Sequence, residues 1–430
     1  MSASRRFFLG TSAAAAAVAG LSKSARAALA PGEAKRADGV TNLALIGCGG
    51  QGRHNLTQMF EAAKAADVGP VRAIAVCDAD SARTADAVAL ANSLNGGGAE
   101  CQAFENHAAL LEAVGKDLDA VIVATPDHQH APASIAAADA GLAVYCEKPL
   151  ANSVADCDAI LAAARRNDVP LQVGSHERSN DKVRRACELV RGGALGELKE
   201  IVLHMPTEQT HHRAVAATEA SDPTVPPPSS LDYAMWLGES TAAAAGPATW
   251  PDMKAVDPQL PGWMPQAGPH FWWRFVSAFG AGEITDRGAH ILDIAQLATG
   301  RDDAEDWEPV SVTGTGGDRP GAFYDAPMRY DFRVTFPSGP DYVGTTEGER
   351  GVRFVGEKGE LFVAVHGGAT TADPASLLET EVDVDLGRTA SHHVNFLRSL
   401  AGKETLFAPA QAGHRTAVLC HRINAALRAA

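Results

Sequence analysis

Leu43-Ala-Leu-Ile-Gly47-Cys-Gly-Gly-Gln-Gly52 joins a short apolar run to the pattern Gly-x-Gly-x-x-Gly. The run predicts a buried strand and residues 54–66 predict a helix, so the glycines fall at a strand–turn–helix junction. There, Gly47 allows the tight turn, Gly49 lets a pyrophosphate approach the backbone, and Gly52 lets the helix pack closely. A structural turn without a ligand is the competing interpretation. The junction predicts a dinucleotide site with these candidate contacts: Gly47, Gly49, Gly50, Gln51, Gly52 and Arg53.

A second apolar run, residues 71–77, is followed directly by an acidic residue, Asp78. A carboxylate at the end of this strand accepts hydrogen bonds from the ribose hydroxyls of a dinucleotide and repels a 2′-phosphate. Asp78 therefore favours NAD over NADP. The competing interpretation is that Asp78 is an ordinary helix N-cap.

Strands and helices continue to alternate as far as residue 174. Continuous Val/Ile/Ala strands, separated by Ala-rich helices, predict a parallel sheet that is covered on both faces. The sequence thus predicts a doubly wound N-terminal Rossmann domain over residues 40–175. The further expected strands are 120–124, 142–146 and 171–174, and the expected helices are 80–95, 132–140 and 154–166.

The pattern changes after residue 175. Strand-like segments recur with Gly- or Pro-containing turns between them, and this predicts an antiparallel sheet. Helices are expected over 184–191 and, at the end of the chain, 412–427. Residues 176–430 are therefore predicted to form a second domain. Its expected strands are 199–204, 310–315, 329–336, 342–346, 352–355 and 361–365.

Composition excludes several classes of protein. The chain has 430 residues, 46% of them hydrophobic, which is enough for two cored domains. A formal charge of −15 argues against a binder of nucleic acid or anionic membrane. The seven cysteines form no CxxC pair, so no disulfide framework or zinc ribbon is expected. The histidine pairs 211–212 and 392–393 point to opposite sides of an extended chain, and no metal site is predicted.

The N-terminus carries a targeting pattern. Residues 4–10, Ser-Arg-Arg-Phe-Phe-Leu-Gly, precede an Ala-rich apolar stretch, and Ala25-Arg-Ala27 offers a cleavage site. This layout predicts a twin-arginine export signal over residues 1–27 and a periplasmic or otherwise exported protein. The apolar stretch is too short for a membrane span, so no membrane insertion of the mature protein is expected. A cytoplasmic protein with a basic N-terminus is the alternative.

Two more motifs follow predicted strands. Residues 125–130 are Thr-Pro-Asp-His-Gln-His, and residues 147–149 are Glu-Lys-Pro. Together with the glycine pattern, and with segments 173–178, 231–238 and 284–290, they resemble the Gfo/Idh/MocA oxidoreductases over most of the chain after residue 40. The resemblance implies a Rossmann domain followed by a C-terminal α/β domain, built on a large, mostly antiparallel sheet.

The same resemblance implies site residues and assembly. The C-terminal domain would bind the substrate and pair with other copies, giving a homo-oligomer, either a dimer or a tetramer. Ligands of a Rossmann sheet lie outside the carboxyl ends of its strands, where both motifs fall. The further cofactor contacts that the motifs imply are Thr125, Pro126, His128, His130, Glu147 and Lys148.

Lys148, Asp286 and His290 are residues of types that suit the oxidation of an alcohol. By resemblance Lys148 faces the cofactor and the substrate hydroxyl, where its ammonium can hydrogen-bond the oxygen that becomes a carbonyl. Asp286 and His290 are four residues apart and share a helix face. Histidine titrates near neutral pH, so His290 is the expected general acid/base, oriented by Asp286. A surface lysine, an N-cap aspartate and a buried histidine are the competing interpretations, and Asp293 is expected to be structural.

Weaker candidates for substrate contact follow from position alone. Arg178 and His176 lie after a strand end, where a surface salt bridge is an equally good interpretation. Trp273 is a candidate for an aromatic platform under a sugar ring, although a tryptophan cluster is more often part of a core. The other members of that possible platform are Trp236, His270 and Trp272.

These observations predict an exported NAD-dependent oxidoreductase. It would move hydride between a tightly held nicotinamide and a hydroxyl-bearing carbon of a sugar, polyol or glycoside, because free NAD is scarce outside the cytoplasm. The alternative is a redox-neutral, NAD-dependent glycoside hydrolase that works by transient oxidation and elimination. A Rossmann-fold ligand sensor is a third class, against which the glycine pattern, Lys148, Asp286 and His290 together argue.

Overall fold

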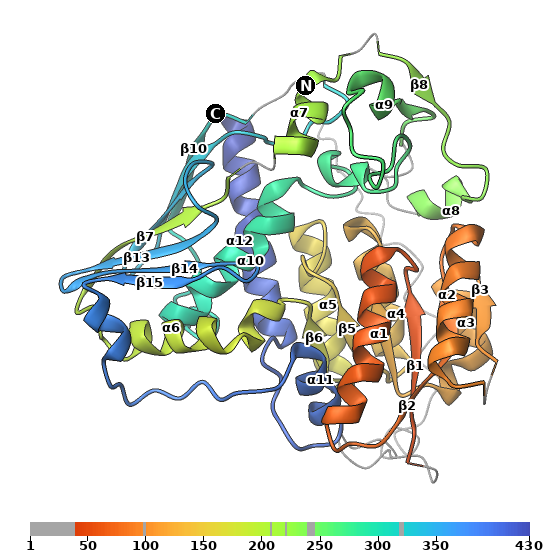
Figure 1. Ribbon diagram of the computed structural model, residues 1–430, viewed down its shortest axis with the longest axis horizontal. Helices are drawn as coiled ribbons and strands as arrows, with labels where there is room; N and C mark the ends of the chain where they lie inside the picture. The colour runs from red at the N-terminus through yellow and green to blue at the C-terminus, as the bar shows by residue number, and fades with distance from the viewer. Residues whose placement is uncertain (1–38, 98–99, 207–208, 220–221, 239–245, 318–321) are drawn as a thin grey trace, which may run out of the picture.

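The computed structural model describes residues 39–97, 100–206, 209–219, 222–238, 246–317 and 322–430. Two large sheets dominate it, a parallel one and a mostly antiparallel one, with long helices between them (Figure 1). The predicted fold class is therefore confirmed. The predicted signal segment, residues 1–27, lies outside the described residues.

The first sheet has six parallel strands in the order β3-β2-β1-β4-β5-β6, the doubly wound arrangement. Two separate apolar clusters cover its faces, which explains why its central strands are apolar throughout. Its strands are β1 (Thr41–Ile46), β2 (Val71–Cys77), β3 (Gln102–Phe104), β4 (Ala120–Val123), β5 (Ala143–Cys146) and β6 (Leu171–Val173). Its helices are α1 (Gly50–Ala65), α2 (Ser81–Leu94), α3 (His107–Val114), α4 (His130–Asp139) and α5 (Val154–Asn167).

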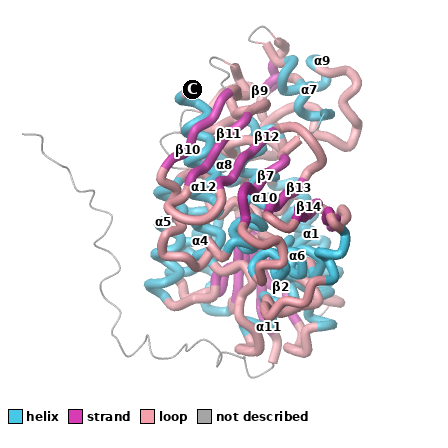
Figure 2. The backbone as a smooth tube through the Cα atoms, turned by 90° about the vertical axis from the view of Figure 1, so that its left-hand side faces the viewer, coloured by secondary structure: helices cyan, strands magenta, loops and turns pink. Residues whose placement is uncertain are grey.

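The second sheet has seven strands in the order β10-β11-β12-β7-β13-β14-β15. Its pairs are antiparallel except for β7 and β12, which run parallel. One face of this sheet packs on helices. The opposite face is turned to the viewer in Figure 2, where the strands lie in front of the helices. The strands are β7 (Leu198–His204), β10 (Ser311–Thr315), β11 (Asp331–Thr335), β12 (Asp341–Thr345), β13 (Gly351–Gly356), β14 (Gly359–Ala364) and β15 (Thr370–Asp373).

Two long helices join the sheets. Helix α10 (Glu283–Thr299) and helix α12 (Ala410–Ala429) pack on each other and on the second sheet, and α10 also packs on α6 (Asp181–Arg191). Helix α12 also packs on α5, and α11 (His392–Leu400) packs on α1. The end of the chain thus contacts the first sheet's helices, and the predicted domain boundary near residue 175 stays a prediction.

The described residues between 209 and 275, called the excursion below, lie above the first sheet. They have their own aromatic core, which includes Trp236, Trp250 and Trp272. The excursion touches the Rossmann part through backbone hydrogen bonds from Ser81 N–H to Ser230 and from Asp232 N–H to Ala79. These contacts place it over the carboxyl ends of β1 and β2. Its elements are α7 (Gln209–Ala217), β8 (Thr224–Val225), α8 (Tyr233–Leu237), β9 (Trp250–Pro251), α9 (Met253–Val256) and the 3-10 turn η7 (Trp272–Phe275).

Within the described ranges, every helix is too short or too polar to span a bilayer. All seven cysteines are buried, unbridged thiols.

Candidate active site

The glycine-rich turn has the backbone geometry that a dinucleotide fold needs. Gly47 has φ +95°, and a Cβ there would lie 2.5 Å from the backbone carbon of Ala124. A Cβ on Gly52 would lie 1.9 Å from the Gly47 carbonyl oxygen. Both positions therefore exclude any larger residue, because a real Cβ never approaches backbone so closely.

The N-terminus of α1 faces this turn. Its N-cap is Gly49, and no described side chain caps the helix there, so its first N–H groups suit phosphate oxygens. A guanidinium nitrogen of Arg83 lies 3.2 Å from where a Gly49 Cβ would be and adds positive charge. Arg53, predicted as a contact, instead forms a surface ion pair with Asp86 at 2.9 Å.

Asp78 is held at the end of β2 with its carboxylate in the same cleft. Its Oδ2 accepts the N–H of Cys48 at 2.6 Å, and its Oδ1 accepts the N–H of Asp80 at 2.9 Å. Each oxygen keeps a lone pair for a ribose hydroxyl. The helix N-cap is Asp80, two residues later, so the alternative interpretation of Asp78 does not hold.

These residues line a cleft of about 610 Å³. Gly47, Gly49, Asp78, Thr125 and Pro126 are the predicted contacts in its wall. The excursion roofs it, and His270 reaches across to Asp80 with Nε2 2.7 Å from Oδ2. Sequence reasoning expected Trp236 and His270 only as parts of a platform. The wall residues that it missed include Ala79, Arg83, Asn106, His107, Gln129 and Met235.

Glu147 and the two motif histidines, His128 and His130, form hydrogen bonds with other groups of the protein. The buried Glu147 carboxylate accepts hydrogen bonds from Gln51 at 3.0 Å and Asn55 at 2.8 Å, which ties α1 to the Glu-Lys-Pro turn. Both ring nitrogens of His130 lie at hydrogen-bond distance from backbone carbonyls, those of Pro149 and Thr125. His130 therefore joins the two motif loops and has no nitrogen left for a nucleotide.

His128 occupies a similar position. Its Nε2 lies 2.9 Å from the Trp236 carbonyl, and its ring packs against Trp236 and Phe279. Burial lowers the pKa of His128 to about 4. The imidazole is thus neutral and connects the cofactor side of the sheet to the excursion above it.

Lys148 and Asp286 meet at the mouth of the first sheet. The Lys148 ammonium donates to the Asp286 carboxylate and, at 3.2 Å, to the Asp286 carbonyl. Burial alone would lower the pKa of Lys148, but the carboxylates of Asp286 and Glu147 raise it. Likewise Lys148 and Arg274 hold the pKa of Asp286 below its ordinary value despite burial. The pair is therefore ionised, with a fixed ammonium.

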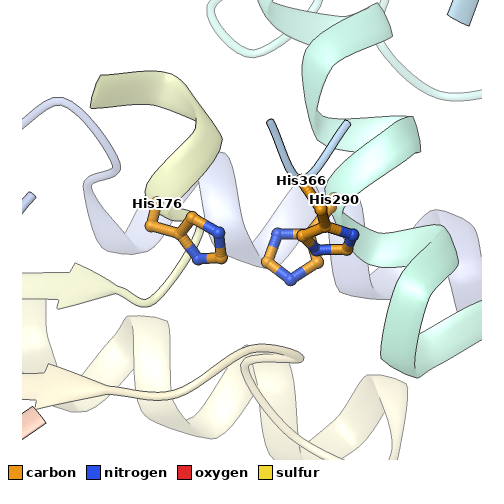
Figure 3. A group of neighbouring side chains, drawn as sticks. All are labelled: His176, His290 and His366. Carbon is orange, nitrogen blue, oxygen red and sulfur yellow. The ribbon is translucent and has the colours of Figure 1, made fainter. Parts of the chain in front are cut away.

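His290 lies one turn beyond Asp286 on α10 and is 4% exposed. Burial, and then the nearby Lys148, lowers its pKa well below the ordinary value. The ring of His290 thus lies near the charge of Lys148 and among polar side chains. It stands with two other imidazoles, His176 after β6 and His366 after β14 (Figure 3).

A buried ion-pair network supports this helix. Arg178, 2% exposed, donates to both oxygens of Asp293 at 2.7 and 2.9 Å and to Asp302 at 2.7 Å. The predicted surface salt bridge is thus a buried one, and the engaged guanidinium corrects the expected substrate contact. Asp293 has the structural role that was expected of it.

The tryptophans divide between core and site. Trp236 and Trp272 are buried in the aromatic core, so they form no open platform. Trp273 lies partly buried at the edge of that core, with the Arg274 guanidinium 4.5 Å from its ring centroid. Arg274 also lies 3.7 Å from Asp286 and so adds a cation to the Lys148–Asp286 pair.

Sequence reasoning missed two further residues here. Asp127 has a buried carboxyl, and burial raises its pKa well above the ordinary value although Lys148 opposes this. Its place inside the Thr-Pro-Asp-His motif was the available signal. His366 had none, because it sits in a turn far along the chain.

Known proteins are similar to this chain, most clearly in its N-terminal part. Residues 41–175 match the model of the Gfo/Idh/MocA oxidoreductase family, described as having an NAD-binding Rossmann fold. Inositol 2-dehydrogenase 3 of Saccharopolyspora erythraea is 31% identical over 186 residues, which are 42% of this chain and 51% of that protein. The chain thus spans about half the length of this curated relative.

Solved structures share the fold over a larger part. The aldose–aldose oxidoreductase of Caulobacter crescentus, in complex with glycerol, is 21% identical with a TM-score of 0.57, over 90% of this chain and 98% of that one. A levoglucosan dehydrogenase in complex with NADH and levoglucosan is 18% identical with a TM-score of 0.57, over 91% and 97%. The fold of both sheets is thus shared.

Proposed function

We propose that residues 41–175, which match the model of the Gfo/Idh/MocA oxidoreductase family, form an NAD-binding domain, and that the whole chain is an oxidoreductase. It would transfer hydride between NAD and a hydroxyl-bearing carbon of a sugar or polyol. The observation that carries this proposal is the Lys148–Asp286 pair, with His290 one turn further, at the mouth of the parallel sheet. A fixed ammonium beside an imidazole is the equipment for oxidising an alcohol.

The residues of the cleft fit NAD. The turn at Gly47 and the uncapped start of α1 would hold the pyrophosphate, with Arg83 beside them. The carboxylate of Asp78 would accept the adenosine ribose hydroxyls and disfavour a 2′-phosphate. Bound NAD supplies a nicotinamide that accepts or donates hydride.

The chain's own groups would manage the substrate oxygen and its proton. Lys148 would donate a hydrogen bond to that oxygen, which stabilises the negative charge that develops there. Asp286 fixes the direction of the ammonium and would contact a neighbouring hydroxyl. His290 would act on the hydroxyl proton, and Arg178 and Asp293 keep its helix in place.

Substrate class rests on the relatives. Inositol, the substrate in the name of the Saccharopolyspora protein, is a cyclic polyol, and levoglucosan is a sugar derivative. A site with several charged donors and acceptors suits a ligand that carries many hydroxyls. Trp273, at the edge of the core, is the remaining candidate to contact an apolar sugar face.

We also propose export and tight cofactor retention. The twin-arginine pattern at residues 4–10 supports export of an already folded protein. The excursion over the cleft, with His270 bonded to Asp80, supports slow release of the nucleotide. Cell fractionation of the wild type and of a variant with Arg5→Lys and Arg6→Lys tests export, and the variant should stay in the cytoplasm.

Assembly is the last part of the proposal. The face of the second sheet that lies in front of the helices in Figure 2 is the surface through which copies would pair. Sedimentation of the purified protein should give a dimer or a tetramer, and a monomer would contradict this assignment.

The test of function begins with denaturing the purified protein and identifying the released nucleotide by mass spectrometry. Recovery of NAD is expected, whereas recovery of NADP alone would overturn the role of Asp78. The intact protein is then mixed with sugars, polyols and glycosides. Reduced nicotinamide should accumulate with at least one of them. Aglycone release without net reduction would instead indicate a redox-neutral glycoside hydrolase, and neither signal would indicate a sensor.

A further inference from the structure

Three imidazoles from distant segments of the chain lie close together (Figure 3). His176 lies in the turn η5 (His176–Ser179) after β6, His290 on α10, and His366 in the turn between β14 and β15. A ring nitrogen of each lies within 4.8 Å of a ring nitrogen of the other two. The His290 ring centroid is 4.7 Å from that of His176 and 5.1 Å from that of His366.

The innermost imidazole has an unused polar atom. His290 is buried, and its Nδ1 has no hydrogen-bond partner among the described residues. Buried polar atoms are nearly always paired, because an unpaired one loses its hydration without compensation. A group in this condition points to a ligand that the protein alone does not supply.

The backbone that carries the third imidazole is held in an uncommon conformation. His366 has φ +59°, in the left-handed region that residues other than glycine seldom adopt. The buried Glu177 carboxylate accepts the His366 N–H at 2.8 Å and lies 3.8 Å from His176 Nε2. The bond comes from the backbone of His366, so the Glu177 carboxylate holds the turn that carries this imidazole, and it lies beside the ring of His176.

We propose that His176, His290 and His366 bind one divalent transition-metal ion of the zinc class. Imidazoles suit such ions, and three protein ligands with an open fourth position are typical of catalytic zinc sites. Tetrahedral ligands at a zinc–nitrogen distance of about 2.0 Å are roughly 3.4 Å apart. The nitrogens, now up to 4.8 Å apart, must therefore approach by at most about 1.4 Å, which the 48% exposed side chain of His176 permits by rotation.

Nearby charges act in both directions. The Lys148 ammonium repels a bound cation, while the carboxylates of Glu177 and Asp286 attract it, and Lys148 is already paired with Asp286. The paired ammonium therefore opposes the ion less than an isolated one would. This site could not be predicted from sequence spacing, since no two of its ligands are neighbours in the chain.

The role given to the ion rests on the proposed function, whereas the binding of the ion does not. A substrate hydroxyl oxygen would fill the fourth position. Because a coordinated His290 nitrogen has no lone pair, the role proposed above for His290 would belong to the metal-free site. In the metal-bound site the hydroxyl proton would pass to solvent on the exposed side of His176. The C–H hydrogen would still leave as hydride to the nicotinamide, so charge and atoms balance.

Metal binding is measured on the full-length protein with its nucleotide in place. Metal content is determined as purified, then the protein is stripped with a chelator and titrated with Co²⁺, whose visible d–d absorption reports tetrahedral nitrogen ligation. The variants are His176→Ala and His366→Gly, glycine being suited to the positive φ. His54→Ala, which removes an exposed imidazole of α1, is the matched control.

Wild type and His54→Ala should bind about one Co²⁺ per chain, and each trio variant should bind at least about 100-fold more weakly. Circular dichroism and nucleotide content should be equal in all four proteins, so lost binding is not lost folding. Equal Co²⁺ affinity in wild type and trio variants, or none in wild type, overturns the site. If sugar oxidation persists without metal binding, only this inference fails. If Co²⁺ binds and no sugar is oxidised, the proposed function fails.

Discussion

The buried network around Arg178 gives the sharpest prediction about stability. Its guanidinium makes three charged hydrogen bonds to Asp293 and Asp302, all of them buried. Arg178→Met keeps an unbranched apolar stem but leaves the buried Asp293 carboxylate without a cation, while Asp302 keeps Arg191 at 3.0 Å. Removing one partner of a buried ion pair costs about 3–5 kcal/mol. For a chain of this size, with about 2 cal/mol/K of unfolding entropy per residue, the midpoint should fall by roughly 5 °C.

The assay is chemical and thermal unfolding followed by tryptophan fluorescence. Arg422→Met is the control, because Arg422 pairs with Glu308 at a similar distance, 2.7 Å, but at the surface. This control should cost less than about 1 kcal/mol. If Arg178→Met is no less stable than Arg422→Met and instead raises KM for substrate, Arg178 contacts substrate and the network has been misassigned.

Three further predictions concern the cleft. Gly52→Ala places a Cβ 1.9 Å from the Gly47 oxygen, so the purified variant should lose its nucleotide in mass spectrometry, while Gly262→Ala, which meets nothing within 4 Å, should keep it. Asp78→Asn keeps an acceptor for the Cys48 N–H but removes the charge, so the preference for NAD over NADP should fall by about tenfold in titrations; an unchanged ratio would contradict the assignment. Lys148→Met should slow nicotinamide reduction by at least about 100-fold with the nucleotide retained, whereas the same change at the exposed Lys64 should have no effect.

The N-terminal half of the fold follows from local pattern. The central strands are apolar throughout because both faces of the sheet are buried, and the glycines at 47 and 52 are dictated by backbone contacts. Strand β3 and helix α3 were not predicted, because Gln102–Phe104 is short, lies at the sheet edge and is largely exposed. The excursion was seen only as an irregular stretch, since its aromatic core is assembled from short elements without a repeating period.

The site residues likewise divide into those that a local motif predicts and those that only the folded chain brings together. Lys148, Asp286 and His290 were predicted because each belongs to a local motif. Arg83 and His270 were not predicted as cofactor contacts, because only folding brings them to the cleft. The ion pairs of Arg178 and the position of His366 depend on contacts between segments far apart in the chain. No spacing rule along one sequence reports such contacts.

The most direct test of the central claim follows the hydrogen itself. Protein containing its NAD is mixed, for a single turnover, with a sugar or polyol that reduces it and that carries deuterium on the carbinol carbons. The nucleotide is then released by acid and weighed by mass spectrometry. The account predicts a reduced nucleotide heavier by one deuterium, and far less of it in Lys148→Met. Label that appears only in solvent, or equal label in both proteins, would contradict hydride transfer at this site.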